Sequence, residues 1–510
     1  MRNRLFTSLL FWGSLLNFFA VSGSAQAFSL QTEADSGSIM QWIPIESELK
    51  GAIQQRVFGG DAGGFYVYQS NGRDRLIEKY SYAGRRIFSH SLPFEDRSVE
   101  VVELVVRKQD VLAFFSIYNP TYRRHGLFVQ RYPLSGEAVG QPELLLDRLE
   151  VSNPSRSEFH VSPDPLNESF MVLHLHHHEP LFSQIFVADY NLERKKLRES
   201  LFQIPVEAER PVIEDLQRDT TAGLVLLVRQ EAKSGRRSAL GDKLPVQDTL
   251  WRLWSIAAGS LDFREQVLCF PGYELPELSM AIDRSRGLIR LTGLLLPPGQ
   301  TTPAAVGSLE CAQVDLAVLH RHVVSLEPSF LQSLGQIRGS LREKLQSPYY
   351  MHPPILRSDG GWVLMAEAVY QTVQTFVQYN QGFPVYREIS RFHNDELVLV
   401  SVNPEGIISW RQIIPKKQVG SQPSPHHSVA RLSVGPNIHL LFNDEGGQRS
   451  RLLMQSVMHQ GDVESRTYQD PVLDELTLIP ADACQLSPST LLIPAQRRKK
   501  HGVLMLSFKG

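Results

Sequence analysis

Ile39-Met40-Gln41-Trp42-Ile43-Pro44-Ile45 is an apolar, strand-like stretch near the N-terminus that belongs to no repeat, and it decides the fold. At the other end, the last repeat stops at Ser507-Phe508-Lys509-Gly510, where earlier repeats turn and add one more strand. A first strand that completes the last repeat closes a ring, and among all-β repeat folds this arrangement is a β-propeller. The sequence therefore predicts that Met40 to Ile45 pair with Val503 to Phe508 in one blade, because an unpaired edge there would invite aggregation.

The repeat is clearest in one short apolar strand that recurs along the chain. Its eight copies are Gly64–Tyr68, Asp110–Phe115, Ser169–Leu173, Gly223–Leu227, Gly287–Leu291, Gly361–Met365, Asn437–Leu441 and Thr490–Ile493. Continuous apolar runs are typical of strands that are buried on both faces. The pattern predicts an all-β propeller of eight blades in a single domain over residues 28–510. Seven blades is the alternative, since the units around Trp254 and Leu316 are degenerate.

The first 27 residues have the layout of a secretory signal peptide. Arg2 and Arg4 precede an apolar stretch from Leu5 to Val21, and Ala25 and Ala27 place small residues at −3 and −1 for cleavage before Phe28. We expect a soluble, exported protein in the periplasm or outside the cell, with no transmembrane segment after cleavage. An uncleaved membrane anchor is the alternative.

Charge and cysteine content exclude several classes of protein. The net charge of −2 and the pI near 6.8 give no reason to expect nucleic acid as a partner. Cys269, Cys311 and Cys484 are too widely spaced for a zinc motif or a disulfide framework. We expect them to be small buried residues, although one pair could form a disulfide in an oxidising compartment.

Two insertions interrupt the sixth repeat. Residues 329–347 carry apolar side chains at helical spacing, which predicts an amphipathic helix that covers an apolar patch or, alternatively, docks a partner. Residues 369–392 predict an aromatic-rich loop inserted in a hairpin. Aromatic side chains supply large contact areas at low entropic cost, so this loop is either a binding surface or a structural cap. Its candidate binding residues are Tyr370, Phe376, Tyr379, Phe383 and Tyr386.

One histidine cluster has the residue types of a metal site. In an extended strand His174, His176 and His178 share a face, and imidazoles spaced in this way can bind zinc or copper. The alternative is a set of metal-free histidines exposed on an outer strand, because three ligands on one strand rarely converge without a fourth. No other cofactor is predicted.

The segment Asn394 to Trp410 contains Leu397-Val398-Leu399-Val400-Ser401-Val402-Asn403-Pro404-Glu405-Gly406, and Ile413 to Gln418 and Leu441 to Asp444 continue the same pattern. This region, roughly residues 350–450, resembles a block found in exported, β-propeller-like proteins of Bacteroidota. The resemblance implies an exported propeller and brings no activity, ligand or catalytic residue with it.

Signatures of nucleophilic and zinc-dependent hydrolases are absent, since the chain contains neither Gly-x-Ser-x-Gly nor His-Glu-x-x-His. We therefore assign no catalytic residue from the sequence. The leading hypothesis is a non-catalytic binding or scaffolding propeller that contacts a protein or glycan of the cell envelope. The alternative is a carbohydrate-active or other hydrolytic propeller with a central acidic site.

Overall fold

The computed structural model describes most of the chain. The described residues are 31–33, 38–46, 48–50, 53–92, 99–134, 139–148, 157–164, 169–178, 182–205, 211–221, 223–231, 249–300, 302–338, 349–380, 383–444, 451–467, 472–498 and 500–508. The predicted signal peptide, residues 1–27, lies outside them. The chain divides into two compact units, one formed by Met1–Val161 with Gln418–Gly510 and the other by Ser162–Lys417. The single domain expected from the repeat stays a prediction.

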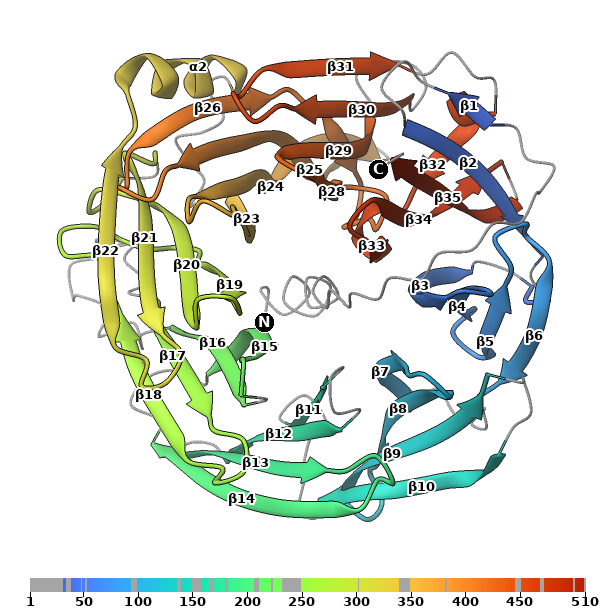
Figure 1. The fold of residues 1–510 in the computed structure, drawn as a ribbon. Helices are drawn as coiled ribbons and strands as arrows, with labels where there is room; N and C mark the ends of the chain where they lie inside the picture. Colours follow the sequence, from blue (N-terminus) through green and yellow to red (C-terminus); the bar gives the residue numbers. More distant parts are fainter. Residues whose placement is uncertain are drawn as a thin grey trace. The chain divides into compact units, whose positions relative to one another are not determined.

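Eight antiparallel sheets follow one another along the described chain, and four strands in sequence order form most of them (Figure 1). This is the pattern of a β-propeller, so the predicted fold class and the count of eight are confirmed. Each of the eight apolar runs chosen from the sequence lies in the second strand of its sheet. Closure of the ring stays a prediction.

The first unit contains the two ends of the chain. Its first two sheets are β3 (Gln54–Asp61), β4 (Gly64–Ser70), β5 (Arg75–Tyr80), β6 (Arg86–Ser91), and β7 (Val99–Val106), β8 (Asp110–Asn119), β9 (Arg124–Pro133), β10 (Val139–Arg148). Another sheet is β28 (Ala430–Val434), β29 (Asn437–Asp444), β30 (Arg451–Val457), β31 (Val463–Thr467). The last comprises β1 (Gln31–Glu33), β2 (Ser38–Ile45), β32 (Leu476–Leu478), β33 (Cys484–Ser487), β34 (Thr490–Arg497) and β35 (Lys500–Phe508), with the 3-10 helices η3 (Leu473–Glu475) and η4 (Pro480–Asp482) beside it.

The second unit is continuous in sequence. Its sheets are β11 (Ser157–Pro163, which begins in the first unit), β12 (Phe170–His178), β13 (Phe182–Tyr190), β14 (Lys196–Pro205); and β15 (Val212–Arg218), β16 (Leu224–Glu231), β17 (Thr249–Ile256), β18 (Phe263–Leu268). Then follow β19 (Ser279–Asp283), β20 (Leu288–Leu295), β21 (Ala305–Ala312), β22 (Val318–Ser325); and β23 (Tyr349–Leu356), β24 (Trp362–Asn380), β25 (Phe383–Val402), β26 (Ile408–Ile414). The short strand β27 (Gln418–Gly420) begins the C-terminal part of the first unit.

The predicted pairing of the two ends of the chain is confirmed. Strand β2 pairs antiparallel with β35 over eight positions, from Ser38 opposite Phe508 to Ile45 opposite His501, and Figure 1 shows β2 in blue beside β35 in red. Strand β1 adds a further strand outside β2. The β2 strand thus supplies the hydrogen bonds that the edge of β35 would otherwise lack.

Side chains from neighbouring sheets form the core within each unit. Between the first and last sheets of the chain, Ile43 and Val503 pack with Phe65 and Val67 in one buried cluster. The amide of Gln55 on β3 also donates to the carbonyl of Gly502 on β35, at 3.1 Å. Strands whose faces both contact neighbouring sheets carry continuous apolar runs, which explains the pattern seen in the sequence.

The two insertions differ in how well they were predicted. Helix α2 (Pro328–Arg338) occupies the first half of the expected helix, and residues 339–347 lie outside the described chain. Its Phe330 is buried in the core of the β23–β26 sheet, as expected for a connector that covers an apolar patch.

The expectation of a loop at residues 369–392 is wrong. These residues continue strands β24 and β25, which pair from Val369–Asn394 to Asn380–Phe383 as a long ribbon, here named the hairpin arm.

The close contact between Gly502 and Trp42 offers a test of the β2–β35 pairing. A Cβ at Gly502 would overlap the Trp42 ring and lie 2.5 Å from the carbonyl oxygen of Ile43. We expect Gly502→Ala to lower the free energy of unfolding by about 1–3 kcal/mol, as overpacking does. Combining it with Trp42→Ala should recover part of that loss, which a double-mutant cycle from urea unfolding would measure. Gly63→Ala, which places Cβ no closer than 3.3 Å to a side chain, is the control.

Candidate acid–base site

Three first strands of neighbouring sheets meet in the second unit, where β19 lies against both β15 and β23. Two of them carry β-bulges. In β15, Ile213 pairs with Val228 and Asp215 with Leu227, which leaves Glu214 without a partner residue. A bulge bends a strand and changes the direction of its side chains, and bulges are over-represented beside active sites.

The bulge in β23 is accompanied by a second one in β25, the strand on the other side of β24. Two prolines, Pro353 and Pro354, stand opposite one residue of β24, because His352 pairs with Met365 and Ile355 with Val363. Proline suits a bulge because it has no N–H to give to the ladder. The second irregularity follows Glu367 in β24, where the register to β25 shifts.

Four carboxyl groups lie close enough to one tyrosine for their charges to affect its pKa. Burial, and then the negative charges of Asp215, Glu367, Glu277 and Glu214, raise the pKa of Tyr350. The phenol therefore stays protonated at physiological pH. These five residues, named the acidic group below, come from β15, the segment before β19, β23 and β24.

Two members of the acidic group have carboxyls that are hard to ionise. Burial raises the pKa of Asp215 to about 6 and that of Glu277 to about 8. Both side chains are half-buried rather than sealed from solvent. At pH 7 Asp215 is mostly ionised and Glu277 mostly protonated, which is the division that a pair of acid and base requires.

The surroundings of Asp215 are only partly polar. The side-chain amide of Gln217 donates to Asp215 Oδ2 at 2.8 Å and also to the carbonyl of Met280 at 3.1 Å. Asp215 Oδ1 is buried and accepts no side-chain hydrogen bond from the described residues, while the backbone N–H of Leu216 lowers the pKa of this carboxyl. A buried acceptor without a donor is costly, so this oxygen is suited to accept a hydrogen bond from a bound molecule.

Glu277 has a basic neighbour that is already engaged. The guanidinium of Arg229 lowers the pKa of Glu277, but less than burial raises it. Arg229 forms an ion pair with Glu214, with 2.6 Å between Nε and Oε1, and Glu214 itself raises the pKa of Glu277. Because the charge of Arg229 is shared with Glu214, Glu277 keeps its proton at neutral pH.

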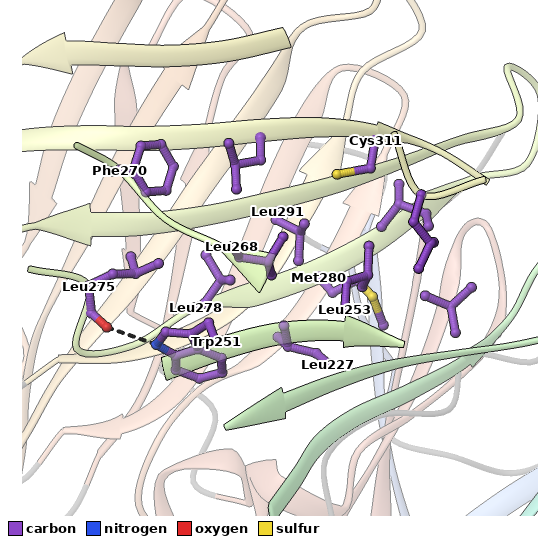
Figure 2. Close-up of a cluster of buried hydrophobic side chains, with 14 of the residues drawn as sticks. Leu227, Trp251, Leu253, Leu268, Phe270, Leu275, Leu278, Met280, Leu291 and Cys311 are labelled. Atoms are coloured by element: carbon purple, nitrogen blue, oxygen red, sulfur yellow. Dashed lines mark hydrogen bonds between the residues drawn. The ribbon is translucent and has the colours of Figure 1, made fainter. Parts of the chain in front are cut away.

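A large apolar core fixes the segment that carries Glu277. Leu275 and Leu278 on either side of it are buried with Met280 in the cluster between the β15–β18 and β19–β22 sheets (Figure 2). The indole nitrogen of Trp251 donates to the carbonyl of Leu275 at 2.8 Å, shown as the dashed line in Figure 2. The core therefore holds the backbone on the N-terminal side of Glu277.

The pKa of Glu367 is shifted in the opposite direction to those of Asp215 and Glu277. Burial alone would raise its pKa, but the Lys416 ammonium and the His352 ring lower it well below its usual range. Both Glu367 and Lys416 have fully buried side chains and form an ion pair. His352 Nε2 lies 3.1 Å from Glu367 Oε2. Glu367 is thus an ionised carboxylate of the acidic group.

The histidines predicted to bind metal lie elsewhere, on β12. His174 and His176 are buried, with ring centroids 5.9 Å apart, so the alternative of exposed histidines on an outer strand is wrong. They lie on the second strand of the sheet, where both faces are covered. The side chain of His178 is outside the described residues. Among the described residues no three His, Cys, Asp or Glu side chains form a group suited to a metal, and zinc or copper binding stays a prediction.

The predicted aromatic binding residues all lie on the hairpin arm. Tyr370 is partly buried, and its hydroxyl donates to Asp395 at 2.5 Å while its ring stacks on His393. Phe376 and Tyr386 are 46% and 69% exposed. Tyr379 and Phe383 lie in the strands, and their side chains are outside the described residues. The arm and the acidic group contain no residue in common.

The three cysteines are free thiols. Cys311 is buried as expected and burial raises its pKa to about 12, Cys484 is partly buried, and Cys269 is exposed, which corrects the expectation for that residue. Along the described residues, no helix has the length and apolar character needed to cross a membrane.

Comparisons with known proteins identify neither a family nor an activity. No family model and no curated protein matches the chain. Among solved structures it is similar to the polysaccharide lyase Uly1, with 11% identity, 91% of this chain and 100% of the lyase covered, and a TM-score of 0.40. It is also similar to the β-propeller domain of the Trilobed protease from Pyrococcus furiosus (11% identity, 80% and 93% covered, TM-score 0.33) and to a prolyl endopeptidase (10%, 79% and 54%, 0.36).

The raised pKa of Glu277 gives a test by stability. Its folded pKa of about 8 lies above an unfolded value of about 4.3, so the stability it contributes is full below pH 4.3 and is lost as the pH rises through 8. Glu277→Gln should therefore match the wild type near pH 4 and exceed it at pH 9, on the order of 1–3 kcal/mol in urea unfolding. Glu388→Gln, at an exposed position on the arm, should show no such pH dependence.

Proposed function

We propose that the acidic group is the acid–base site of a hydrolase. The observation that carries this proposal is the division between Asp215 and Glu277, whose pKa values lie on either side of neutrality around the same tyrosine. Perturbed carboxyls that converge on one place are a mark of functional sites. The half-buried position of both side chains supports the same interpretation, as does the buried Oδ1 of Asp215, which accepts no side-chain hydrogen bond from the described residues.

In this reaction Asp215 accepts a proton from the attacking water, and Glu277 donates its proton to the leaving oxygen. Water adds to the electrophilic carbon as the bond to the leaving group breaks, so no oxidant or cofactor is needed. Afterwards Asp215 is protonated and Glu277 ionised, and proton exchange with solvent restores the starting state. Many glycoside hydrolases cleave the glycosidic bond with such a pair of carboxyl groups. We propose a glycan of the cell envelope as the substrate.

We infer from the N-terminal segment that the protein is exported to the periplasm or outside the cell. A basic start, an apolar stretch and small residues before Phe28 support export, and an exported hydrolase meets envelope glycans directly.

We expect hydrolysis to have a bell-shaped pH profile with limbs near 6 and 8, because Asp215 must be ionised and Glu277 protonated. Asp215→Asn and Glu277→Gln should each lower kcat by about 10²–10⁴-fold on any glycan that the wild type cleaves. Release of reducing ends from envelope polysaccharides measures this. Asp482→Asn is the matched control, since burial also raises the pKa of Asp482 to about 6, in the other unit. Equal activity in all four proteins, or no cleavage by any of them, would refute the proposal.

A second function, binding to an envelope protein, is favoured by the hairpin arm. Val373, Phe376, Val377, Tyr386 and Ile389 are exposed, and the alternation of the paired strands places Phe376 and Tyr386 on opposite faces of the ribbon. An extended ribbon with large apolar side chains on both faces is suited to insertion between surfaces of a partner.

The arm proposal is tested by cross-linking the purified protein to an envelope fraction. Phe376→Ser combined with Tyr386→Ser should abolish a specific cross-linked product, because both anchoring side chains are lost. Leu319→Ser on β22 removes an equally exposed apolar side chain, 48% exposed, and should leave that product unchanged. A product that survives the double substitution would count against the arm as the contact.

A further inference from the structure

A chain of polar side chains extends from Lys416, through Glu367 and His352, to Tyr350. It begins with the Lys416–Glu367 ion pair, in which both side chains are completely removed from solvent. Burying two opposite charges costs about as much free energy as their attraction returns, so a pair of apolar residues would serve stability equally well. An ion pair that joins Lys416 to a member of the acidic group therefore calls for a role beyond packing.

Two hydrogen bonds hold the Lys416 ammonium in place. Lys416 follows β26, and its ammonium donates to the carbonyl of Asn394 at 3.0 Å as well as to Glu367 Oε1. The side-chain amide of Asn394 donates to the same carboxylate oxygen at 3.4 Å. With two donors on one oxygen, Glu367 stays ionised and its second oxygen is directed at His352.

The contact with Glu367 determines the state of the His352 ring. An ionised carboxylate can only accept hydrogen bonds, so the proton at this contact belongs to His352 Nε2. The tautomer and the direction of the ring follow from that hydrogen bond. The ring in turn packs edge-on against Tyr350, with ring centroids 4.9 Å apart and an interplanar angle of 82°.

We propose that Lys416 and Glu367 are positioning residues that act through His352 to hold the Tyr350 phenol among the carboxyls of the acidic group. The proposal rests on the hydrolytic function given above, because it assigns these residues to the same site. Neither Lys416 nor Glu367 can touch a substrate, since both are fully buried. The proline bulge after His352 supports this role by fixing the strand at the point where the histidine leaves it.

The test needs a variant that removes both charges and keeps the fold. Lys416→Met alone leaves a buried carboxylate without its counter-ion and is expected to destabilise the protein. Glu367→Gln combined with Lys416→Met removes the ion pair while keeping the shape. The matched control is Arg107→Met combined with Asp110→Asn, which removes a buried ion pair of the other unit.

The first measurement is the nitrogen NMR spectrum of the histidine rings in the full chain, with His352 identified by its loss in His352→Gln. We expect one set of ring-nitrogen signals, with the proton held on Nε2, in the wild type and in the control. The Glu367→Gln/Lys416→Met variant should show a mixture of tautomers, because a neutral amide accepts or donates equally well. A single unchanged tautomer in that variant would overturn the proposal.

The second measurement is the kinetics of hydrolysis. We expect kcat to fall by about 10²-fold in the Glu367→Gln/Lys416→Met variant, with KM and the two pH limbs almost unchanged, since displaced groups slow the chemical step. A loss of stability with unchanged kcat would show a purely structural role and overturn the proposal. If the wild type cleaves no glycan, the hydrolytic proposal fails, and the tautomer measurement still decides whether Lys416 and Glu367 hold His352.

Discussion

The pairing of β2 with β35 is the interaction on which the fold of the first unit depends. Without β2, the last sheet would present the whole length of β35 as an open edge, at a place where the core needs Ile43 against Val503 and Phe65. Gln55 donates a hydrogen bond to the Gly502 carbonyl at this contact. Glycine at position 502 leaves room for the Trp42 ring, which a Cβ would overlap. Backbone pairing and apolar packing therefore both stabilise the contact between the first and last sheets of the chain.

The acidic group shows how similar carboxyls acquire different properties from their partners. Glu367 is the most deeply buried, yet it is ionised, because a buried ammonium and a histidine face it. Asp215 and Glu277 keep some contact with solvent, yet they hold protons to higher pH because their basic neighbours are absent or shared. The counter-charge, more than the depth of burial, decides the state of each carboxyl.

The sequence predicted the elements whose pattern follows directly from burial. A strand covered on both faces must be apolar throughout, so the eight second strands could be recognised, and the unmatched apolar stretch at Met40–Ile45 pointed to its partner. The hairpin arm was missed because its residues Val373 to Gln378 are exposed to solvent, so burial left no pattern in them. Its residues Thr372 to Gln378 do not alternate between apolar and polar, and a ribbon exposed on both faces leaves no such signal.

The candidate site was missed for a different reason. Asp215, Glu277 and Glu367 are far apart in the chain, and only the packing of three sheets brings their charges to Tyr350. Two local signals were present in the sequence. The adjacent acids Glu214-Asp215 interrupt an apolar strand, and Pro353-Pro354 interrupts another directly after His352. Both mark bulges, and bulges on neighbouring first strands could have directed attention there.

The two units also differ in the order in which their strands are synthesised. The second unit is one uninterrupted segment, Ser162–Lys417, whose four sheets are all made before the chain ends. The first unit is assembled from two segments that are far apart in the sequence, and β2 cannot pair with β35 until β35 has been synthesised. Strand β2 must therefore remain without its partner while the second unit is synthesised, and any factor that protects β2 from aggregation has to act during that interval.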